Sequence, residues 1–77
     1  MNIVVIGLGS MGKRRIRLLK QYIETEGVKD WEVLGVDFNA ERCEESEKLY
    51  GIKTFSSLEQ ADEIYELDAA VISTAPL

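Results

Sequence analysis

Three features of the sequence predict an α/β fold, half of a doubly wound parallel sheet with helices on both faces. Short, nearly uninterrupted apolar runs occur at residues 3–6, 33–36 and 69–72, and such runs are typical of strands buried on both faces of a parallel sheet. Longer amphipathic stretches separate them, and no repeat or low-complexity tract interrupts the pattern. This alternation implies right-handed crossovers, and winding from the middle outward gives the strand order 3-2-1-4.

The first helix is predicted from Met11 to about Glu24, shortly after the first strand. Its apolar residues recur at spacings of four, three and four, so they form one stripe that can lie on a sheet. Gly27 is placed to end this helix. The stripe consists of Gly12, Ile16, Leu19 and Ile23.

The second helix is predicted from Ala40 to Tyr50, with Asn39 as its N-cap and Gly51 as the left-handed residue after its end. Its apolar face is thin. The side chains expected to point inward are those of Cys43, Leu49 and Tyr50.

Residues 53–55 are predicted to form a brief edge strand. The sequence Ser56-Ser57-Leu58-Glu59 has the form of a capping box and predicts a third helix, so the two serines are interpreted as structural. The inward side chains of this helix are expected to be Leu58, Ala61, Ile64 and Tyr65. The fourth strand, 69–72, is as apolar as a central strand although no fifth strand follows, so its edge is expected to self-associate or to be mobile.

The length of 77 residues suffices for one compact domain but not for a cofactor domain with a separate substrate domain. We therefore expect one domain over residues 1–77, or a piece of something larger. No apolar stretch is long enough to cross a bilayer, and the basic residues follow the first apolar run rather than precede it. These features predict a cytoplasmic protein with no membrane partner.

The sequence contains no histidine and a single cysteine, Cys43. This composition excludes an internal disulfide, the familiar zinc sites and the Ser-His and Cys-His catalytic pairs. Cys43 is interpreted as a small buried hydrophobe, because no base is present to activate its thiol. The sequence thus predicts neither catalytic nor metal-binding residues.

The net charge of -5 is unevenly distributed along the chain. Residues 1–23 contain five cations and no acid, whereas residues 24–77 contain four cations and fourteen acids. Most of the surface would repel a polyanion, so the local basic segment favours a small anionic ligand over a nucleic acid. For Arg17 and Lys20, the alternative is a solvated helix face.

The segment Gly7-Leu8-Gly9-Ser10-Met11-Gly12 has the spacing GxGxxG and lies between a strand and an amphipathic helix, the context in which this motif binds dinucleotides. Gly7 would permit a sharp turn, Gly9 would let a pyrophosphate approach the backbone, and Gly12 would let the helix pack closely. The N–H groups at the helix start attract an anion. The alternative is a tight turn without a ligand.

Asp37 ends the second predicted strand, where a carboxylate can accept hydrogen bonds from both hydroxyls of an adenosine ribose. It would repel a 2'-phosphate, so NAD is favoured over NADP as the cofactor, although Arg42 could soften that preference. The alternative for Asp37 is a turn residue that caps the loop before Asn39. Phe38 would lie against the adenine or pack in the core.

Cations at the start of the first helix are candidates for binding the phosphates. Arg14 and Arg15 fall in its first turns, and Lys13 could share this role. At the end of the fourth strand, Ser73, Thr74, Ala75 and Pro76 are expected to border the ligand crevice, since ligands bind outside the carboxyl ends of parallel strands where the strand order reverses. The alternative is that this segment only ends the strand.

Four segments in order resemble the N-terminal domain of the glucose-fructose oxidoreductase and inositol dehydrogenase (Gfo/Idh/MocA) family. They are VVIGLGSMGKRR, VLGVDFNAER, EKLYGIKTFSSLEQ and DAAVISTAPL, and together they cover essentially the whole chain. The resemblance implies a Rossmann domain that binds a nicotinamide cofactor for the oxidation or reduction of a sugar-like hydroxyl or carbonyl. It further implies that Gly7 to Gly12 cover the pyrophosphate, Asp37 the adenosine ribose, and Ser73 to Pro76 the nicotinamide-side ribose.

The chain departs from this family at two places. Arg15 stands where many members carry histidine, and the catalytic lysine of the Glu-Lys-Pro motif would lie beyond Leu77. The resemblance thus implies that residues 1–77 are the truncated dinucleotide-binding domain of a longer enzyme, without its C-terminal substrate domain. The chain alone is expected to bind the dinucleotide without catalysis, and the small-molecule substrate belongs to the full-length enzyme. Two alternatives are a non-catalytic nucleotide-sensing module and an S-adenosylmethionine-dependent methyltransferase, the second of which needs no pyrophosphate site.

Overall fold

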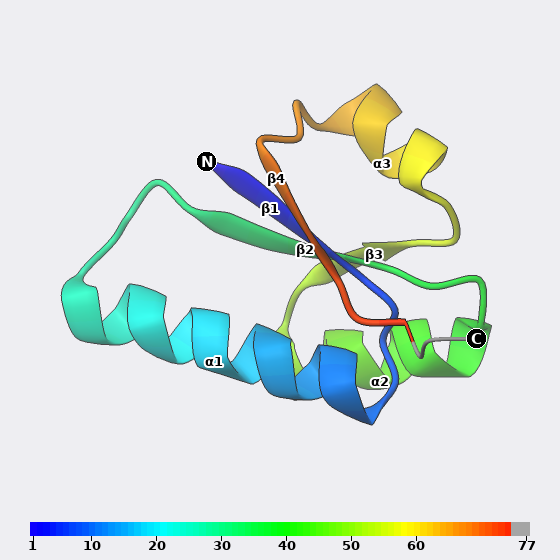
Figure 1. The fold of residues 1–77 in the computed structure, drawn as a ribbon, viewed down its shortest axis with the longest axis horizontal. Coiled ribbons are helices and arrows are strands. Elements are labelled where there is room, and N and C mark those ends of the chain that lie inside the picture. The colour runs from blue at the N-terminus through cyan, green and yellow to red at the C-terminus, as the bar shows by residue number, and fades with distance from the viewer. Residues whose placement is uncertain (75–77) are drawn as a thin grey trace.

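The apolar runs form the centre of a parallel sheet, and the amphipathic stretches form helices that connect its strands. The computed structural model describes residues 1–74. Its strands are β1 (Asn2–Ile6), β2 (Glu32–Val36), β3 (Lys53–Phe55) and β4 (Ala69–Ile72), and its helices are α1 (Ser10–Glu26), α2 (Ala40–Tyr50) and α3 (Leu58–Ile64). The strands pair in the order β3-β2-β1-β4, all parallel, as predicted (Figure 1).

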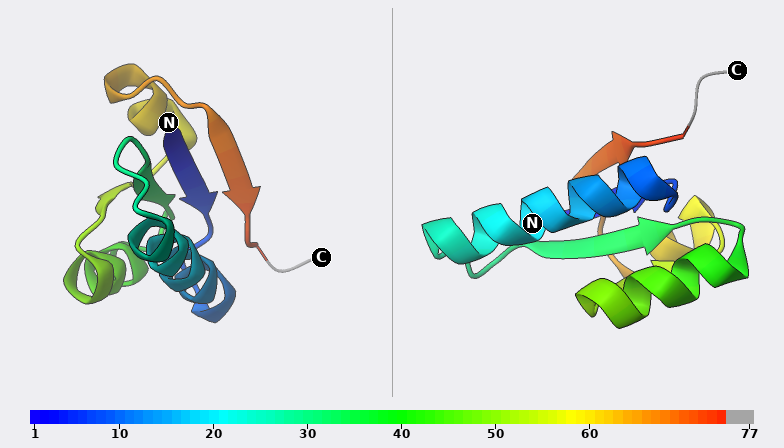
Figure 2. Two further views of the ribbon diagram at one scale, coloured as in Figure 1. Left: turned by 90° about the vertical axis from the view of Figure 1, so that its left-hand side faces the viewer. Right: turned by 90° about the horizontal axis from the view of Figure 1, so that it is seen from below.

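Helices cover both faces of the sheet. α1 and α2 lie on one face and α3 on the other (Figure 2). Two clusters of buried side chains result, because successive residues of a strand point to opposite faces. The cluster under α1 and α2 is formed by Val5, Leu8, Ile16, Val33 and Ile52, and the cluster under α3 by Val4, Leu34, Val36 and Ala61.

The helix ends follow local sequence signals. Gly27 and Gly51 both adopt left-handed backbone conformations after α1 and α2, with φ of 65° and 64°, where a side chain would be strained. The side chain of Asn39 accepts the N–H groups of Glu41 and Arg42 and so caps α2. These three predictions are confirmed.

The capping box before α3 lies one residue later than predicted. Ser57, and not Ser56, is the N-cap, and its hydroxyl accepts the N–H of Gln60. Gln60 in turn accepts the N–H and the hydroxyl of Ser56. The motif alone did not fix the register, because either serine can act as the N-cap, and the side chain of Gln60 bonds to Ser56, the residue before the cap.

The inward faces of α2 and α3 differ in part from the prediction. Leu49, Leu58 and Ile64 are exposed, at 63%, 43% and 68%, so their assignment as inward side chains is wrong. Cys43 and Tyr50 pack against one cluster and Tyr65 against the other. α3 has only seven residues, and such a short helix can bury one small residue, Ala61, while most of its other side chains remain in solvent.

Within residues 1–74, no helix combines the length and the apolar character needed to span a lipid bilayer.

Candidate functional site

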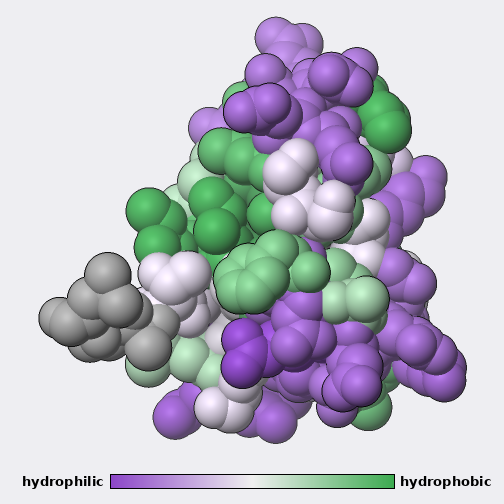
Figure 3. All heavy atoms as spheres, turned by 90° about the vertical axis from the view of Figure 1, so that its right-hand side faces the viewer, coloured by the Kyte–Doolittle hydropathy of each residue, from purple (hydrophilic) through white to green (hydrophobic). Residues whose placement is uncertain are grey.

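A cleft of about 540 Å³ opens at the carboxyl ends of the strands, a size typical of ligand pockets. It lies beside the point between β1 and β4 where the strand order reverses, as predicted for an open parallel sheet. In Figure 3, this end of the molecule shows weakly polar and apolar side chains across its middle, between strongly hydrophilic regions. The lining consists of Ile6, Gly7, Gly9, Ser10, Met11, Val36, Asp37, Phe38, Arg42, Ser56, Ser73 and Thr74.

Two glycines of the GxGxxG segment are required by the protein itself. Gly7 has φ of 96°, and a Cβ there would lie 3.0 Å from the carbonyl carbon of Ser73. A Cβ at Gly12 would lie 1.8 Å from the carbonyl oxygen of Gly7. Gly12 thus lets α1 begin against the end of β1, which agrees with its predicted packing role.

Gly9 is different, because nothing in the fold demands a glycine there. Its backbone is extended, with φ of -72° and ψ of -164°, which any residue can adopt. A Cβ would meet only the tip of the Arg42 side chain, at 3.8 Å. The space that a side chain at Gly9 would fill is therefore the cleft itself.

No side chain among the described residues caps the N-terminus of α1. Gly9 occupies the N-cap position, and the first turn contains no acidic residue. By contrast, α2 and α3 are capped by Asn39 and Ser57, and each has a glutamate in its first turn. The first N–H groups of α1, which have no partner within the helix, lie at a cleft lined by Ser10 and Met11 and favour an anion there.

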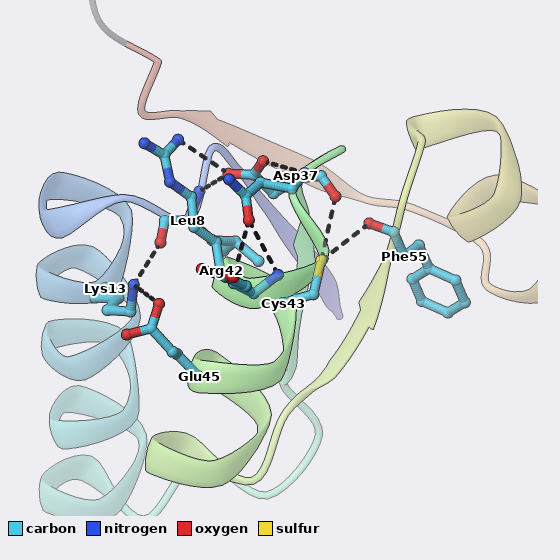
Figure 4. Close-up of polar contacts among 9 residues, drawn as sticks. Leu8, Lys13, Asp37, Arg42, Cys43, Glu45 and Phe55 are labelled. Atoms are coloured by element: carbon cyan, nitrogen blue, oxygen red, sulfur yellow. Dashed lines mark hydrogen bonds and ion pairs between the residues drawn. The ribbon is translucent and has the colours of Figure 1, made fainter.

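Lys13 stabilises the glycine loop, residues 7–12, from the side of α2. Its Nζ donates to the carbonyl oxygen of Leu8 at 2.8 Å and lies 3.6 Å from Oε1 of Glu45 in α2. Figure 4 shows this lysine between the two helices. Lys13 does not line the cleft, and its charge is engaged in holding the loop against α2.

Asp37 joins the loop to the end of β2 (Figure 4). Its side chain is 4% exposed, and its Oδ2 accepts the N–H of Leu8 while Oδ1 accepts the N–H of Asn39, both at 2.8 Å. Burial raises the pKa of this carboxyl group, but the two N–H groups and the guanidinium of Arg42 outweigh burial and lower the pKa below its ordinary value of 3.8. The carboxylate is therefore ionised at neutral pH.

The predicted capping role of Asp37 is thus present, since Oδ1 holds the turn that begins α2. Each carboxylate oxygen has a second lone pair, and Asp37 lines the cleft. The cap therefore leaves acceptor capacity for a ligand hydroxyl.

Arg42 and Phe38 lie at the mouth of the cleft. The guanidinium of Arg42 is 3.7 Å from Oδ2 of Asp37 and about half exposed. Phe38 is 89% exposed, which excludes packing in the core and leaves its ring free on the ligand side. The thiol of Cys43 donates to the carbonyl oxygen of Asp37 at 3.2 Å and so helps to fix the turn that carries both side chains.

Ser73 closes the cleft on the side of β4. Its N–H donates to the carbonyl oxygen of Ile6 at 2.7 Å. The guanidinium of Arg15 donates to the carbonyl oxygen of Ile72 at 2.8 Å and to Oγ of Ser73 at 3.2 Å. Arg15 is therefore bound to the end of β4.

The other predicted site residues fall outside the lining. Leu8 is fully buried beneath the cleft, with its N–H and carbonyl already bonded. Gly12 is buried against the loop, and Arg14 is exposed on α1 and does not line the cleft. Ala75 and Pro76 lie outside the described residues.

Three lining residues were missed in the sequence. Ile6 and Val36 are the last residues of β1 and β2, and Ser56 directly follows β3. The rule that pointed to Asp37 and Ser73, that ligands bind at the carboxyl ends of parallel strands, applies equally to these positions. Ser56 was interpreted only as part of a capping box.

Searches of the chain against protein-family models, curated proteins and solved structures found no match. Nor do residues 1–74 contain a group of three or more His, Cys, Asp or Glu side chains arranged to hold a metal ion. The site therefore has to be interpreted from its own geometry. It combines an uncapped helix start, a buried carboxylate and an exposed aromatic ring around one cleft, an arrangement suited to an anionic ligand that also carries hydroxyl groups and a planar base.

Proposed function

We propose that this chain binds a dinucleotide, NAD in preference to NADP, as the cofactor-binding part of a nicotinamide-dependent oxidoreductase of the Gfo/Idh/MocA type. The observation that carries the proposal is the open space at Gly9. Gly7 and Gly12 are needed by the fold, whereas the room beside Gly9 and the bare start of α1 benefit only a ligand. A pyrophosphate fits this place, because its oxygens accept from backbone N–H groups at a helix start.

The position of Asp37 supports the assignment of an adenosine ribose. The carboxylate is ionised and retains free lone pairs toward the cleft. A 2'-phosphate would bring a second negative charge close to it, which favours NAD. Arg42 compensates in part, since its guanidinium lies 3.7 Å from the same carboxylate. We therefore expect a moderate preference for NAD and measurable binding of NADP.

The exposed ring of Phe38 provides a flat apolar surface for the adenine. Ser73 and Thr74 line the cleft on the side of β4, and we expect them to contact the nicotinamide-side ribose. A bound nicotinamide would supply the hydride chemistry. The chain's own contribution is to bind and orient the cofactor.

The chain is not expected to transfer hydride alone. Asp37 is the one acidic residue in the lining, and both of its oxygens already hold backbone N–H groups. The proton transfer to or from a sugar-like hydroxyl would require residues supplied by a substrate domain. We expect the protein to work in the cytoplasm, because the basic residues follow the first apolar run of the sequence rather than precede it.

The proposal is tested by calorimetric titration of the wild-type chain with NAD and with NADP. Gly9→Ala adds a methyl group where the pyrophosphate should lie, in a backbone conformation that alanine adopts without strain. We expect it to weaken NAD binding by about tenfold or more, equivalent to about 1.4 kcal/mol. Gly27→Ala, at the far end of α1, is the control: its left-handed φ of 65° lowers stability, but the folded variant should bind NAD with unchanged affinity.

Two results would contradict the proposal. The first is wild-type chain that binds neither dinucleotide while remaining folded. The second is a Gly9→Ala variant that binds NAD as tightly as the wild type does, which would place the ligand away from the glycine loop.

A further inference from the structure

The walls of the cleft follow the order of the strands in the sheet, which is β3-β2-β1-β4. Across the cleft the lining residues are, in that order, Ser56 after β3, Asp37 after β2, Gly7 and Gly9 after β1, and Ser73 after β4. A ligand with its pyrophosphate at Gly9 and a ribose at Asp37 therefore continues toward β3. The inference below rests on the proposed function, in which the group beyond that ribose is the adenine.

Ser56 lies beside the residue proposed to hold the adenosine ribose. Val36 of β2 pairs in register with Phe55 of β3, and the N–H of Asp37 donates to the carbonyl oxygen of Phe55 at 3.1 Å. Figure 4 shows the thiol of Cys43 between the carbonyl oxygens of Asp37 and Phe55. Because neighbouring strands lie about 4.8 Å apart, Ser56, one residue after Phe55, is next to Asp37. An adenine whose ribose is bound by Asp37 is thus within reach of Ser56.

The hydroxyl proton of Ser56 is held by Gln60 in α3. Oε1 of Gln60 accepts the backbone N–H of Ser56 at 3.0 Å and lies 2.6 Å from the Ser56 hydroxyl oxygen. A backbone N–H can only donate, so the amide atom of Gln60 that faces it is the oxygen and not the nitrogen. This oxygen carries no proton. The Ser56 hydroxyl must therefore be the donor in the second bond.

Ser56 consequently presents an acceptor to the cleft. A hydroxyl group has one proton and two lone pairs, and the proton is already used. Ser56 is exposed and lines the cleft, so its oxygen can accept a further hydrogen bond from a ligand. Adenine carries an amine, a donor, at the ring position where guanine carries a carbonyl oxygen, an acceptor. Hypoxanthine carries the same carbonyl oxygen, and two facing acceptors have no proton to share.

We propose that Ser56 selects adenine over purines with a carbonyl oxygen at this position by accepting a hydrogen bond from the exocyclic amine. Gln60 is the positioning residue that keeps Ser56 an acceptor. It is not among the described residues of the lining and acts through Ser56. The exposed ring of Phe38 cannot make this distinction, because every base can stack on an aromatic side chain.

The first test compares, by calorimetry, the affinities for NAD and for nicotinamide hypoxanthine dinucleotide, in which a carbonyl oxygen replaces the amine. We expect the wild type to bind NAD about five- to tenfold more tightly, the difference that one neutral hydrogen bond makes. Ser56→Ala should bring this ratio close to one by weakening NAD binding. Ser57→Ala is the matched control. It makes the same change at the next residue, which caps α3, and the folded variant should keep the ratio of the wild type.

The second test changes the positioning residue and leaves Ser56 in place. Gln60→Ala removes the acceptor of the Ser56 proton, so the hydroxyl becomes free to donate to the carbonyl oxygen of hypoxanthine. We expect the hypoxanthine dinucleotide to bind more tightly while NAD binding changes little. Gln60→Glu retains an oxygen acceptor and should restore the preference for NAD. An unchanged ratio in Gln60→Ala would overturn the positioning role.

Failure of this inference can be told apart from failure of the proposed function. Wild-type chain that binds the two dinucleotides equally, or whose preference survives Ser56→Ala, would overturn the role of Ser56 and leave the dinucleotide site in place. Wild-type chain that remains folded and binds neither dinucleotide would overturn both.

Discussion

The carboxylate of Asp37, at the end of β2, accepts the backbone N–H of Leu8 in the glycine loop at 2.8 Å. Residues 29 positions apart are thereby joined through one buried side chain. The same carboxylate accepts the N–H of Asn39, which precedes α2. The loop after β1 and the turn after β2, which form two walls of the cleft, are thus positioned by a single charged group.

We predict that Asp37→Asn destabilises the folded chain. Asparagine offers one acceptor atom in place of two and turns an N–H donor toward Leu8 or Asn39, so a buried backbone N–H loses its partner. The expected loss in the free energy of unfolding is about 1–3 kcal/mol, measured by urea denaturation at neutral pH. Asp62→Asn, on the exposed face of α3, is the control and should change the stability little.

The contribution of Asp37 should depend on pH in a definite direction. Its pKa in the folded chain lies below the ordinary value of 3.8, so the ionised carboxylate stabilises the fold above that pH. This stabilisation is lost as the pH falls through the folded pKa. The difference in stability between the wild type and Asp37→Asn should therefore be largest above pH 3.8 and shrink in stronger acid. A difference that grows on acidification would contradict this prediction.

We expect alanine substitutions at Gly12 and Gly9 to have different effects, the first on stability and the second on NAD binding. Gly12→Ala places a Cβ 1.8 Å from the carbonyl oxygen of Gly7, a backbone atom that cannot move without displacing the loop. We expect a loss of about 3 kcal/mol or more in the free energy of unfolding. Gly9→Ala should leave thermal unfolding nearly unchanged while weakening NAD binding. Equal destabilisation by the two substitutions would show that Gly9 also serves the fold.

Lys13 and Arg14 are adjacent cations for which we expect opposite outcomes. Lys13→Met retains the aliphatic stem but removes the amine that donates to the carbonyl oxygen of Leu8. We expect a loss of about 1–2 kcal/mol in stability, as for other hydrogen bonds to charged groups. Arg14→Met removes an exposed charge and should stay within about 0.5 kcal/mol of the wild type. Equal stability of both variants in urea denaturation would show that the loop does not depend on the lysine.

The sequence predicted the strands and most helix ends because these depend on local features, and it predicted the strand order because parallel strands are joined by right-handed crossovers. Buried runs such as residues 3–6 and 33–36 differ clearly from amphipathic stretches. Gly27, Asn39 and Gly51 act through their own backbone and side-chain chemistry. None of these signals requires knowledge of distant contacts.

Predictions that depended on distant contacts were less accurate. The rotation of α3 about its axis is set by the β-strand residues beneath Ala61, and its short sequence does not reveal that Leu58 and Ile64 remain exposed. Similarly, spacing along α1 could not show that Arg15 reaches the end of β4 or that Lys13 lies 3.6 Å from Glu45 of α2. These contacts join the helix to segments that are near only after folding. They change the interpretation of Lys13 and Arg15, which hold the walls of the cleft in place and were expected to bind phosphate.

One buried residue provides a test in which we expect a gain of stability. The hydroxyl of Ser46 in α2 is fully buried and has no hydrogen-bond partner among residues 1–74, and such a group costs free energy on folding. Ser46→Ala removes the hydroxyl and introduces the residue with the highest helix propensity. We expect the free energy of unfolding to rise by about 0.5–2 kcal/mol, measured by urea denaturation. A loss of stability would mean that the hydroxyl is bonded in solution, for example to a buried water molecule between α2 and the sheet.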